Sequence, residues 1–182
     1  MQESLKQYEQ DKVKKEASIA EKNTQDDLTG LFNHRYLHMA IEKEISRASR
    51  YDLKFSLVFL DLDHFKQIND THGHIVGDNI LKRIAKLLCA DLRSRDITAR
   101  WGGEEFILLS SHTSADSAYR LGEKLRLAIA STVFKAEERP ITVTTSIGIA
   151  KFESPEKFDH SLALADQQLY RAKNTGKNKV CF

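Results

Sequence analysis

The sequence predicts an α/β (α+β) domain whose mixed central sheet holds about five strands flanked by helices. Amphipathic helical segments alternate with short apolar runs, and a tight glycine turn joins two of these runs. A late segment, 141–150, is rich in β-branched residues and indicates a further strand. Because a hairpin pairs its strands antiparallel, the sheet is expected to be mixed rather than fully parallel.

The composition is that of a globular domain with a sizeable core. Hydrophobic residues make up 41% and charged residues 30% of the 182 positions, and the net charge of +2 provides no general attraction to nucleic acid polymers. Cys89 and Cys181 are too few and too distant for a disulfide framework, which favours a reducing cytoplasmic setting. No apolar stretch reaches the ~18–20 residues of a membrane span. A membrane anchor in a longer parent protein stays compatible with this prediction.

Residues 1–24 are highly charged and favour a helix. Leu5, Tyr8 and Ile19 fit one heptad register, but Lys12 and Lys15 occupy the same seam. The segment is therefore either a connector helix that projects from the domain or pairs weakly with its copy, or a solvated tail. The sequence leaves both interpretations open.

The folded part begins near residue 25. Gly30 interrupts the chain, and Asn33 is a suitable N-cap for a helix that runs through Arg50. The remaining predicted elements are a central strand over 55–60, a helix over 77–92, hairpin arms over 98–101 and 105–110, a helix over 115–131, a strand over 141–150 and a helix over 162–173, with Pro140 and Pro155 in loops.

The glycine turn carries the strongest chemical signal. Gly102 and Gly103 permit a tight turn because glycine reaches positive φ without steric cost. Glu104 and Glu105 follow at once and lead into the apolar run 106–109. Carboxylates on a rigid turn suit a divalent metal and the phosphates it carries. Taken alone, the same pattern also describes a common surface hairpin.

A second acidic pair lies at the end of the predicted central strand. Strand alternation places Asp61 and Asp63 on one face if the strand continues that far. These residues are either solvated acids at a strand end or, together with Glu104 and Glu105, a carboxylate cluster on two neighbouring strands. Hard oxygen ligands of this kind select Mg²⁺ or Mn²⁺.

These motifs resemble the GGDEF family of diguanylate cyclases, in a Gly-Gly-Glu-Glu-Phe form. The matching stretches occur in the family's order from about residue 25 to the C-terminus: 27–33, 61–66, Asn69-Asp70, Gly73-His74, Gly77-Asp78, 102–106, Ala165-Asp166, Leu169-Tyr170 and Ala172-Lys173. The resemblance implies a palm-like cyclase domain over 25–182 and makes 1–24 a connector to an upstream sensor domain.

What the resemblance implies for the reaction is the condensation of two GTP molecules into cyclic di-GMP with release of two pyrophosphates. Two Mg²⁺ or Mn²⁺ ions would be held by Asp61, the carbonyl of Leu62 and Glu104, with Glu105 close by. Glu104 is the first candidate for the acid–base group, with Glu105 beside it, although a metal-lowered pKa of the 3′-hydroxyl would make a protein base partly redundant.

The resemblance also implies the substrate contacts. Asn69 and Asp78 would read guanine; alternatively, they are a loop polar residue and a helix-capping acid. His74 would contact substrate or pin its loop. The remaining expected contacts are Phe65, Lys66, Lys173 and Lys177, of which the lysines would face the triphosphate. Lys177 departs from the family's common Gly-Arg-Asn pattern, because lysine keeps the charge but loses the forked geometry of arginine.

Two further expectations concern regulation and assembly. Arg93 and Asp96 match an inhibitory product site for cyclic di-GMP; they are otherwise an ordinary i, i+3 charge pair. Because each 3′-hydroxyl must attack the other nucleotide, two domains related by a two-fold axis are expected in the active state.

The same residues disfavour two other functional classes. A catalytically idle binding module for GTP or cyclic di-GMP is disfavoured by the presence of Asp61, Glu104, Glu105, Asn69 and Asp78. A cyclase that acts on ATP is disfavoured by the residues expected to read guanine.

Overall fold

The computed structural model describes residues 24–51, 53–90, 92–111, 113–136, 139–152 and 158–182. Nearly all of the predicted connector over 1–24 lies outside these residues, so its helix and the domain boundary stay predictions. Among the described residues, no helix combines the length and the hydropathy needed to cross a membrane.

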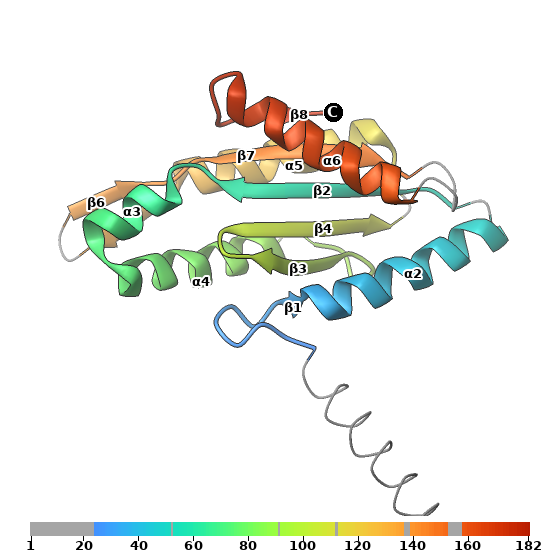
Figure 1. The fold of residues 1–182 in the computed structure, drawn as a ribbon, viewed down its shortest axis with the longest axis horizontal. Coiled ribbons are helices and arrows are strands. Elements are labelled where there is room, and N and C mark those ends of the chain that lie inside the picture. Colours follow the sequence, from blue (N-terminus) through green and yellow to red (C-terminus); the bar gives the residue numbers. More distant parts are fainter. Residues whose placement is uncertain (1–23, 52, 91, 112, 137–138, 153–157) are drawn as a thin grey trace, which may run out of the picture.

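A six-stranded mixed sheet forms the centre of the molecule, in the order β1-β3-β4-β2-β7-β8 (Figure 1). Its strands are β1 Phe32–Asn33, β2 Phe55–Leu62, β3 Ile97–Gly102, β4 Glu105–Ser111, β7 Thr145–Lys151 and β8 Val180–Cys181. The four long strands pair antiparallel, while the two-residue edge strands β1 and β8 pair parallel. The mixed class is confirmed, and the sheet has six strands, four long and two short, where about five were expected.

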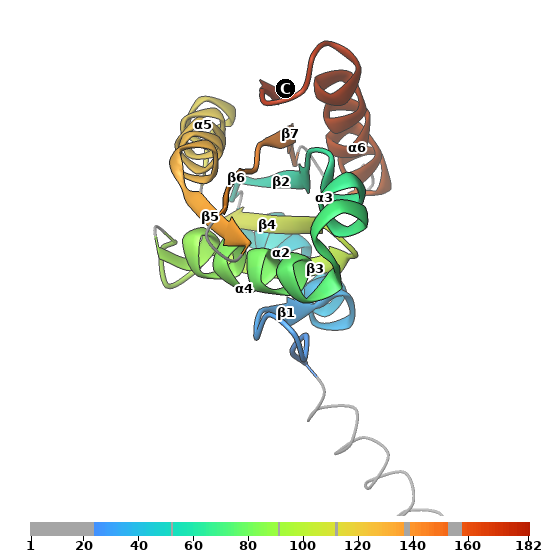
Figure 2. The same cartoon turned by 90° about the vertical axis from the view of Figure 1, so that its left-hand side faces the viewer.

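Helices cover both faces of the sheet (Figure 2). The helices are α2 His34–Tyr51, α3 Phe65–His72, α4 His74–Ala90, α5 Ala115–Ser131 and α6 Phe158–Asn174. On one face, Ile84 of α4 and Leu125 of α5 belong to the same apolar cluster as Leu60 of β2. On the other face, Leu37 of α2 and Leu169 of α6 join a second apolar cluster.

Strand β2 lies between these two apolar layers and all eight of its residues are buried. This burial explains why its sequence reads as a continuous apolar run rather than an alternating one. The strand extends beyond the predicted 55–60 and includes Asp61, so a carboxylate is held in regular, rigid backbone.

Several predicted boundaries are confirmed. The helix over 115–131 corresponds to α5, which Ser114 caps through a hydrogen bond from the Ser117 N–H. The side chain of Asn33 accepts from the Tyr36 N–H at 3.0 Å, as expected for the N-cap of α2. The hairpin arms correspond to β3 and β4.

Three predictions about elements were wrong. Helix α3 was missed, because it has only eight residues and only Phe65 and Ile68 among them are apolar, too few for a pattern to be recognised. Helix α4 begins at His74 instead of Gly77, since Gly73, at φ 85°, ends α3 and leads directly into it. The run 141–150 divides between β7 and β6 Arg139–Thr142, and β6 pairs with β5 Val133–Ala136 in a separate hairpin that includes Pro140.

Candidate active site

The two predicted acidic segments lie on adjacent strands. Strands β2 and β4 pair antiparallel, with Asp61 directly opposite Glu105. The N–H of Leu62 donates to the carbonyl of Glu104 at 3.3 Å, which holds the glycine turn against the end of β2. The fold therefore brings Asp61, Leu62, Glu104 and Glu105 together, although 43 positions separate Asp61 from Glu104 in the sequence.

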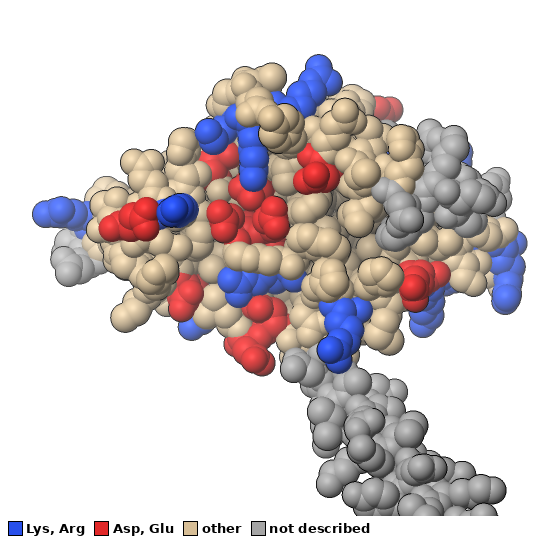
Figure 3. Space-filling view, in the orientation of Figure 1, with Lys and Arg blue, Asp and Glu red and all other residues tan. Residues whose placement is uncertain are grey.

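Asp61 is the most perturbed acid of this cluster. Its side chain is only 8% exposed, and the ammonium Nζ of Lys173, on α6, lies 2.7 Å from Oδ2. Burial raises the pKa of Asp61 to about 6, against the lowering effect of Lys173 and with a further rise from Glu104 and Glu105. Figure 3 shows acidic side chains gathered on this face, with basic side chains directly above and below them.

The donor set fits a divalent cation that arrives with a phosphate ligand. Among the residues described by the structure, no three His, Cys, Asp or Glu side chains form a preassembled metal site. Mg²⁺ is commonly held by one or two carboxylates together with substrate phosphates, and it prefers oxygen donors of the kind present here. Clustered carboxylates repel one another, and burial makes Asp61 harder to ionise. A bound cation would offset both effects.

Asp63 has a different role from the expected cluster member. Its buried carboxylate accepts hydrogen bonds from the Thr144 and Ser146 hydroxyls, each at 2.7 Å, and from the Asn178 N–H at 3.0 Å. Asp63 therefore ties the end of β2 to β7 and to the segment after α6.

The glycine turn is confirmed as a hairpin turn, but not by the expected backbone geometry. Neither Gly102 nor Gly103 has positive φ, and a bulge interrupts the β3–β4 register between Arg100 and Gly102. A Cβ on Gly103 would meet nothing within 4 Å. The turn is instead held by Arg100, whose Nε and Nη2 donate to the Gly103 carbonyl at 3.0 and 2.8 Å.

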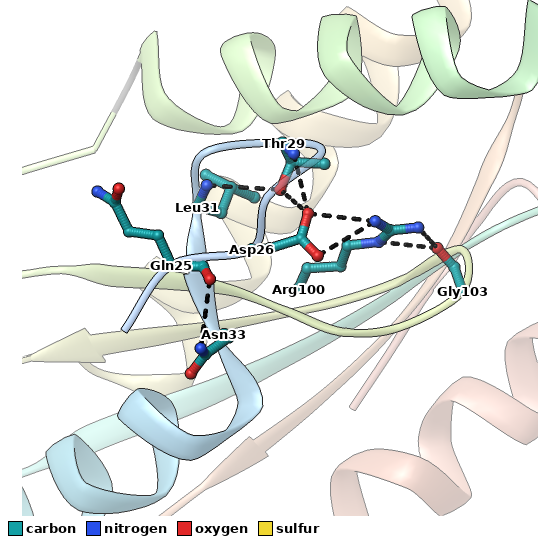
Figure 4. Close-up of polar contacts among 7 residues, drawn as sticks. All are labelled: Gln25, Asp26, Thr29, Leu31, Asn33, Arg100 and Gly103. Atoms are coloured by element: carbon teal, nitrogen blue, oxygen red, sulfur yellow. Dashed lines mark hydrogen bonds and ion pairs between the residues drawn. The ribbon is translucent and has the colours of Figure 1, made fainter. Parts of the chain in front are cut away.

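Arg100 also connects this turn to the start of the domain (Figure 4). Its Nη1 lies 3.1 and 3.2 Å from the two carboxylate oxygens of Asp26, which also accepts from the Thr29 N–H and hydroxyl. Burial alone would raise the pKa of Asp26, but the hydrogen bonds from Thr29 and Arg100 lower it overall. Sequence reasoning missed this link, since no local pattern relates residues 74 positions apart.

The residues expected to read guanine lie on α3 and α4. Asn69 Oδ1 is buried and has no hydrogen-bond partner among the described residues. A Cβ on Gly77 would lie 1.9 Å from this oxygen, so glycine allows the two helices to approach. Asp78 and His74 are exposed on α4, and Asp78 lies past the first turn, which excludes the helix-capping alternative.

The other predicted contacts are distributed around the acidic cluster. Phe65 is 5% exposed, and its side chain packs in the core next to Gly77; its contact with substrate stays a prediction. Lys66 is exposed on α3. Lys173 is paired with Asp61, and Lys177 follows α6 with its backbone at φ 58°.

A hollow of about 310 Å³ opens next to this cluster, between β4 and α6. Two of the residues that line it, Glu105 and Lys173, belong to the predicted site, and three more belong to the matching motifs, Asp166, Leu169 and Tyr170. Its lining residues are Glu105, Ala163, Asp166, Gln167, Leu169, Tyr170 and Lys173.

Arg93 and Asp96 lie just before β3, at the opposite end of that strand from the glycine turn. Six strand residues separate the two sites by ~20 Å. The Asp96 carboxylate accepts from the Ser110 hydroxyl and the Ser111 N–H, and from the backbone N–H of Arg93 at 3.2 Å. Arg93 is exposed, so its guanidinium is accessible from solvent.

Comparison with known proteins agrees with this arrangement. The family described as "Diguanylate cyclase, GGDEF domain" matches residues 23–179. Diguanylate cyclase DgcP of Pseudomonas aeruginosa is 44% identical over 155 residues, which cover 85% of this chain and 23% of that protein. Diguanylate cyclase DosC of Escherichia coli K12 is 36% identical over 156 residues, 85% of this chain and 34% of that protein.

Solved structures show the same fold. Diguanylate cyclase SiaD of Pseudomonas aeruginosa, in complex with its activator SiaC, superposes with a TM-score of 0.85 at 34% identity, over 97% of this chain and 68% of that one. The GGDEF domain of DgcB from Caulobacter crescentus, in complex with c-di-GMP, gives 0.84 at 29% identity, over 87% and 94%.

The mixed sheet presents paired carboxylates from a strand end and a hairpin turn, and oxygen donors of this kind suit a divalent cation and the phosphates it carries. The chain belongs to the GGDEF family. It spans only about a quarter to a third of the length of the two curated relatives described above.

Proposed function

We propose that this domain is a diguanylate cyclase that condenses two GTP molecules into cyclic di-GMP and two pyrophosphates. The single observation that carries the proposal is the convergence of Asp61, Glu104 and Glu105 beside Lys173, in a chain of the GGDEF family. In each half-reaction, a 3′-oxygen loses its proton and bonds to the α-phosphorus of the other nucleotide, and pyrophosphate leaves.

Asp61, the carbonyl of Leu62 and Glu104 would hold Mg²⁺ or Mn²⁺, with Glu105 beside them. Two such ions would supply charge stabilisation for the attacking oxygen and the departing pyrophosphate. Glu104 is the proposed acceptor of the 3′-hydroxyl proton. Lys173, now paired with Asp61, would be released toward the triphosphate once a cation neutralises that carboxylate.

Guanine would be read by Asn69 and Asp78. An Asp carboxylate accepts from both N1–H and the exocyclic amine of guanine, whereas adenine presents an acceptor at N1. Asn69 Oδ1 is buried and has no donor within the part of the chain that the structure describes, which supports the proposal, because a buried acceptor without a donor is costly unless a ligand provides one. His74, Lys66 and Lys177 would complete the contacts to substrate.

The active state would be a homodimer, because one such site binds one GTP and the product has two-fold symmetry. We expect residues 1–24 to connect the domain to an upstream sensor in a longer protein, which agrees with the greater length of the relatives. Cyclic di-GMP bound at Arg93 and Asp96 would inhibit the enzyme.

The test is incubation of the protein with GTP or ATP, each with Mg²⁺, followed by mass analysis of the nucleotide product. Cyclic di-GMP should form from GTP alone, and specific activity should rise steeply with protein concentration. Glu104→Ala should abolish product while the circular dichroism spectrum is retained. Glu42→Ala, an exposed acid on α2, is the matched control and should retain activity.

No cyclic di-GMP from GTP at any protein concentration would contradict the proposed activity. Undiminished turnover by Glu104→Ala would remove its assigned role, and a specific activity independent of concentration would argue against assembly of two domains.

A further inference from the structure

The segment that carries Lys177 has an unusual backbone. Gly176, Lys177 and Asn178 have φ values of 114°, 58° and 45°, three consecutive residues at positive φ. Asparagine adopts this left-handed geometry readily, but it is unfavourable for Lys177 and persists there where surrounding contacts impose it. The contacts that impose it therefore determine where Lys177 stands.

Two of these contacts are made with α6 and with Asp63, which follows β2. The N–H of Lys177 donates to the carbonyl of Ala172 at 3.0 Å, which ends α6. The N–H of Asn178 donates to the buried Asp63 carboxylate at 3.0 Å. These bonds fix the backbone on the side of β2 and α6.

The third contact comes from α5, on the other face of the sheet. Arg126 Nη1 donates to the side-chain oxygen of Asn178 at 2.9 Å. The same guanidinium is held by Glu123 through Nε at 3.1 and 3.2 Å and Nη2 at 2.8 Å. Both side chains are mostly buried, 16% exposed for Arg126 and 27% for Glu123.

This arrangement gives Arg126 little freedom to move. A bidentate pair fixes the plane of a guanidinium, so the N–H groups of Nη1, which lie outside the pair, point in fixed directions. Nη1 donates to Asn178, the residue next to Lys177. Glu123 thus orients Arg126, and Arg126 orients the segment that follows α6.

We propose that Arg126 and Glu123 are positioning residues for the triphosphate, acting through Asn178 on Lys177. The inference rests on the proposed function, because it assigns Lys177 to the phosphates of GTP. According to this proposal, α5, which contributes no residue to the acidic cluster, also affects the affinity for GTP. Lys177 stands where the family commonly has arginine. A single ammonium group would then contact the phosphates instead of a forked guanidinium, so phosphate affinity depends more strongly on where that group lies.

The experiment compares binding of two nucleotides by calorimetry in the presence of Mg²⁺. 3′-Deoxy-GTP cannot condense because it lacks the nucleophile, and GMP lacks the β- and γ-phosphates. Arg126→Ala should weaken 3′-deoxy-GTP roughly tenfold, the effect of one orienting hydrogen bond, and leave GMP unchanged. Arg120→Ala, an exposed arginine on the same helix, is the control and should change neither.

Asn178→Gly provides a second route that spares the α5 ion pair. Glycine tolerates the positive φ but removes the side-chain acceptor, so it should reproduce the selective loss of 3′-deoxy-GTP affinity. In a double-mutant cycle, Arg126→Ala should have no further effect once Lys177 is alanine.

Equal weakening of both nucleotides, additive losses with Lys177→Ala, or unchanged 3′-deoxy-GTP affinity in Arg126→Ala would each overturn the proposal. These outcomes are separable from failure of the proposed function. A wild-type protein that makes no cyclic di-GMP contradicts the cyclase assignment, whereas the binding comparison reports on the segment itself.

Discussion

The guanidinium of Arg100 donates two hydrogen bonds to the carbonyl oxygen of Gly103, at 3.0 and 2.8 Å. The same side chain pairs with Asp26 at the start of the described chain. One residue thus holds the turn that presents Glu104 and joins it to the segment that follows residues 1–24. The position of the turn is therefore sensitive to this pair.

Arg100→Lys should reduce turnover about tenfold, because lysine keeps the charge but cannot bond Gly103 and Asp26 at once. Because both side chains of the pair are mostly buried, the free energy of unfolding measured with urea should fall by about 1–2 kcal/mol. Asp26→Asn should lower activity less, since the bonds to Gly103 remain. A larger loss of activity from Asp26→Asn than from Arg100→Lys would contradict this hierarchy.

The raised pKa of Asp61 predicts a pH dependence of stability in the absence of metal. The folded pKa of about 6 exceeds the ordinary 3.8, so the native state holds the proton more tightly than the unfolded chain. Stability should therefore fall as pH rises from about 4 to 6, by an amount on the order of 3 kcal/mol for this group. Asp61→Asn removes the titration.

The measurement is the difference in unfolding free energy between wild type and Asp61→Asn across this pH range, without divalent metal. Mg²⁺ should reverse the trend for wild type, because it binds the ionised carboxylate, and its affinity should weaken about tenfold per pH unit below 6. A difference that stays constant with pH would show that Asp61 ionises normally.

Gly77→Ala tests the contact between α3 and α4. Alanine favours a helix by ~1 kcal/mol over glycine, but the new Cβ would collide with Asn69 Oδ1. We expect GTP affinity to fall at least tenfold as Asn69 is displaced. Asn79→Ala, at an exposed neighbouring position, is the control for helix propensity. Retained GTP affinity in Gly77→Ala would remove Asn69 from the proposed guanine site.

Arg93→Ala should relieve inhibition by cyclic di-GMP. The concentration of cyclic di-GMP that halves the rate should rise at least tenfold, whereas the initial rate without added product should not change. The structure favours this variant over Asp96→Ala, because Asp96 accepts hydrogen bonds from Ser110 and Ser111 and its loss should also reduce stability. Product titration of the initial rate provides the measurement. Unchanged inhibition in Arg93→Ala would leave this pair with a structural role only.

Local pattern was sufficient to predict much of this domain. Apolar periodicity identified α5, a continuous apolar run identified the core of β2, and the polar side chain of Asn33 identified the start of α2. The paired acids were visible because each lies within a few residues of a strand end or a turn. Interactions of this kind span one turn or one strand, so a short window of sequence contains them.

Contacts between distant segments were decided by tertiary structure alone. Sheet pairing brought Asp61 opposite Glu105 and Asp63 next to Thr144 and Ser146, and the packing of α6 on the sheet placed Lys173 against Asp61. Arg100 and Asp26, and Arg126 and Asn178, are partners only because helices and strands far apart in the chain pack together. Composition and spacing identify the side chains that are available for chemistry. The distances between these side chains, their burial and their pKa values depend on the packing of distant segments, which no local pattern encodes.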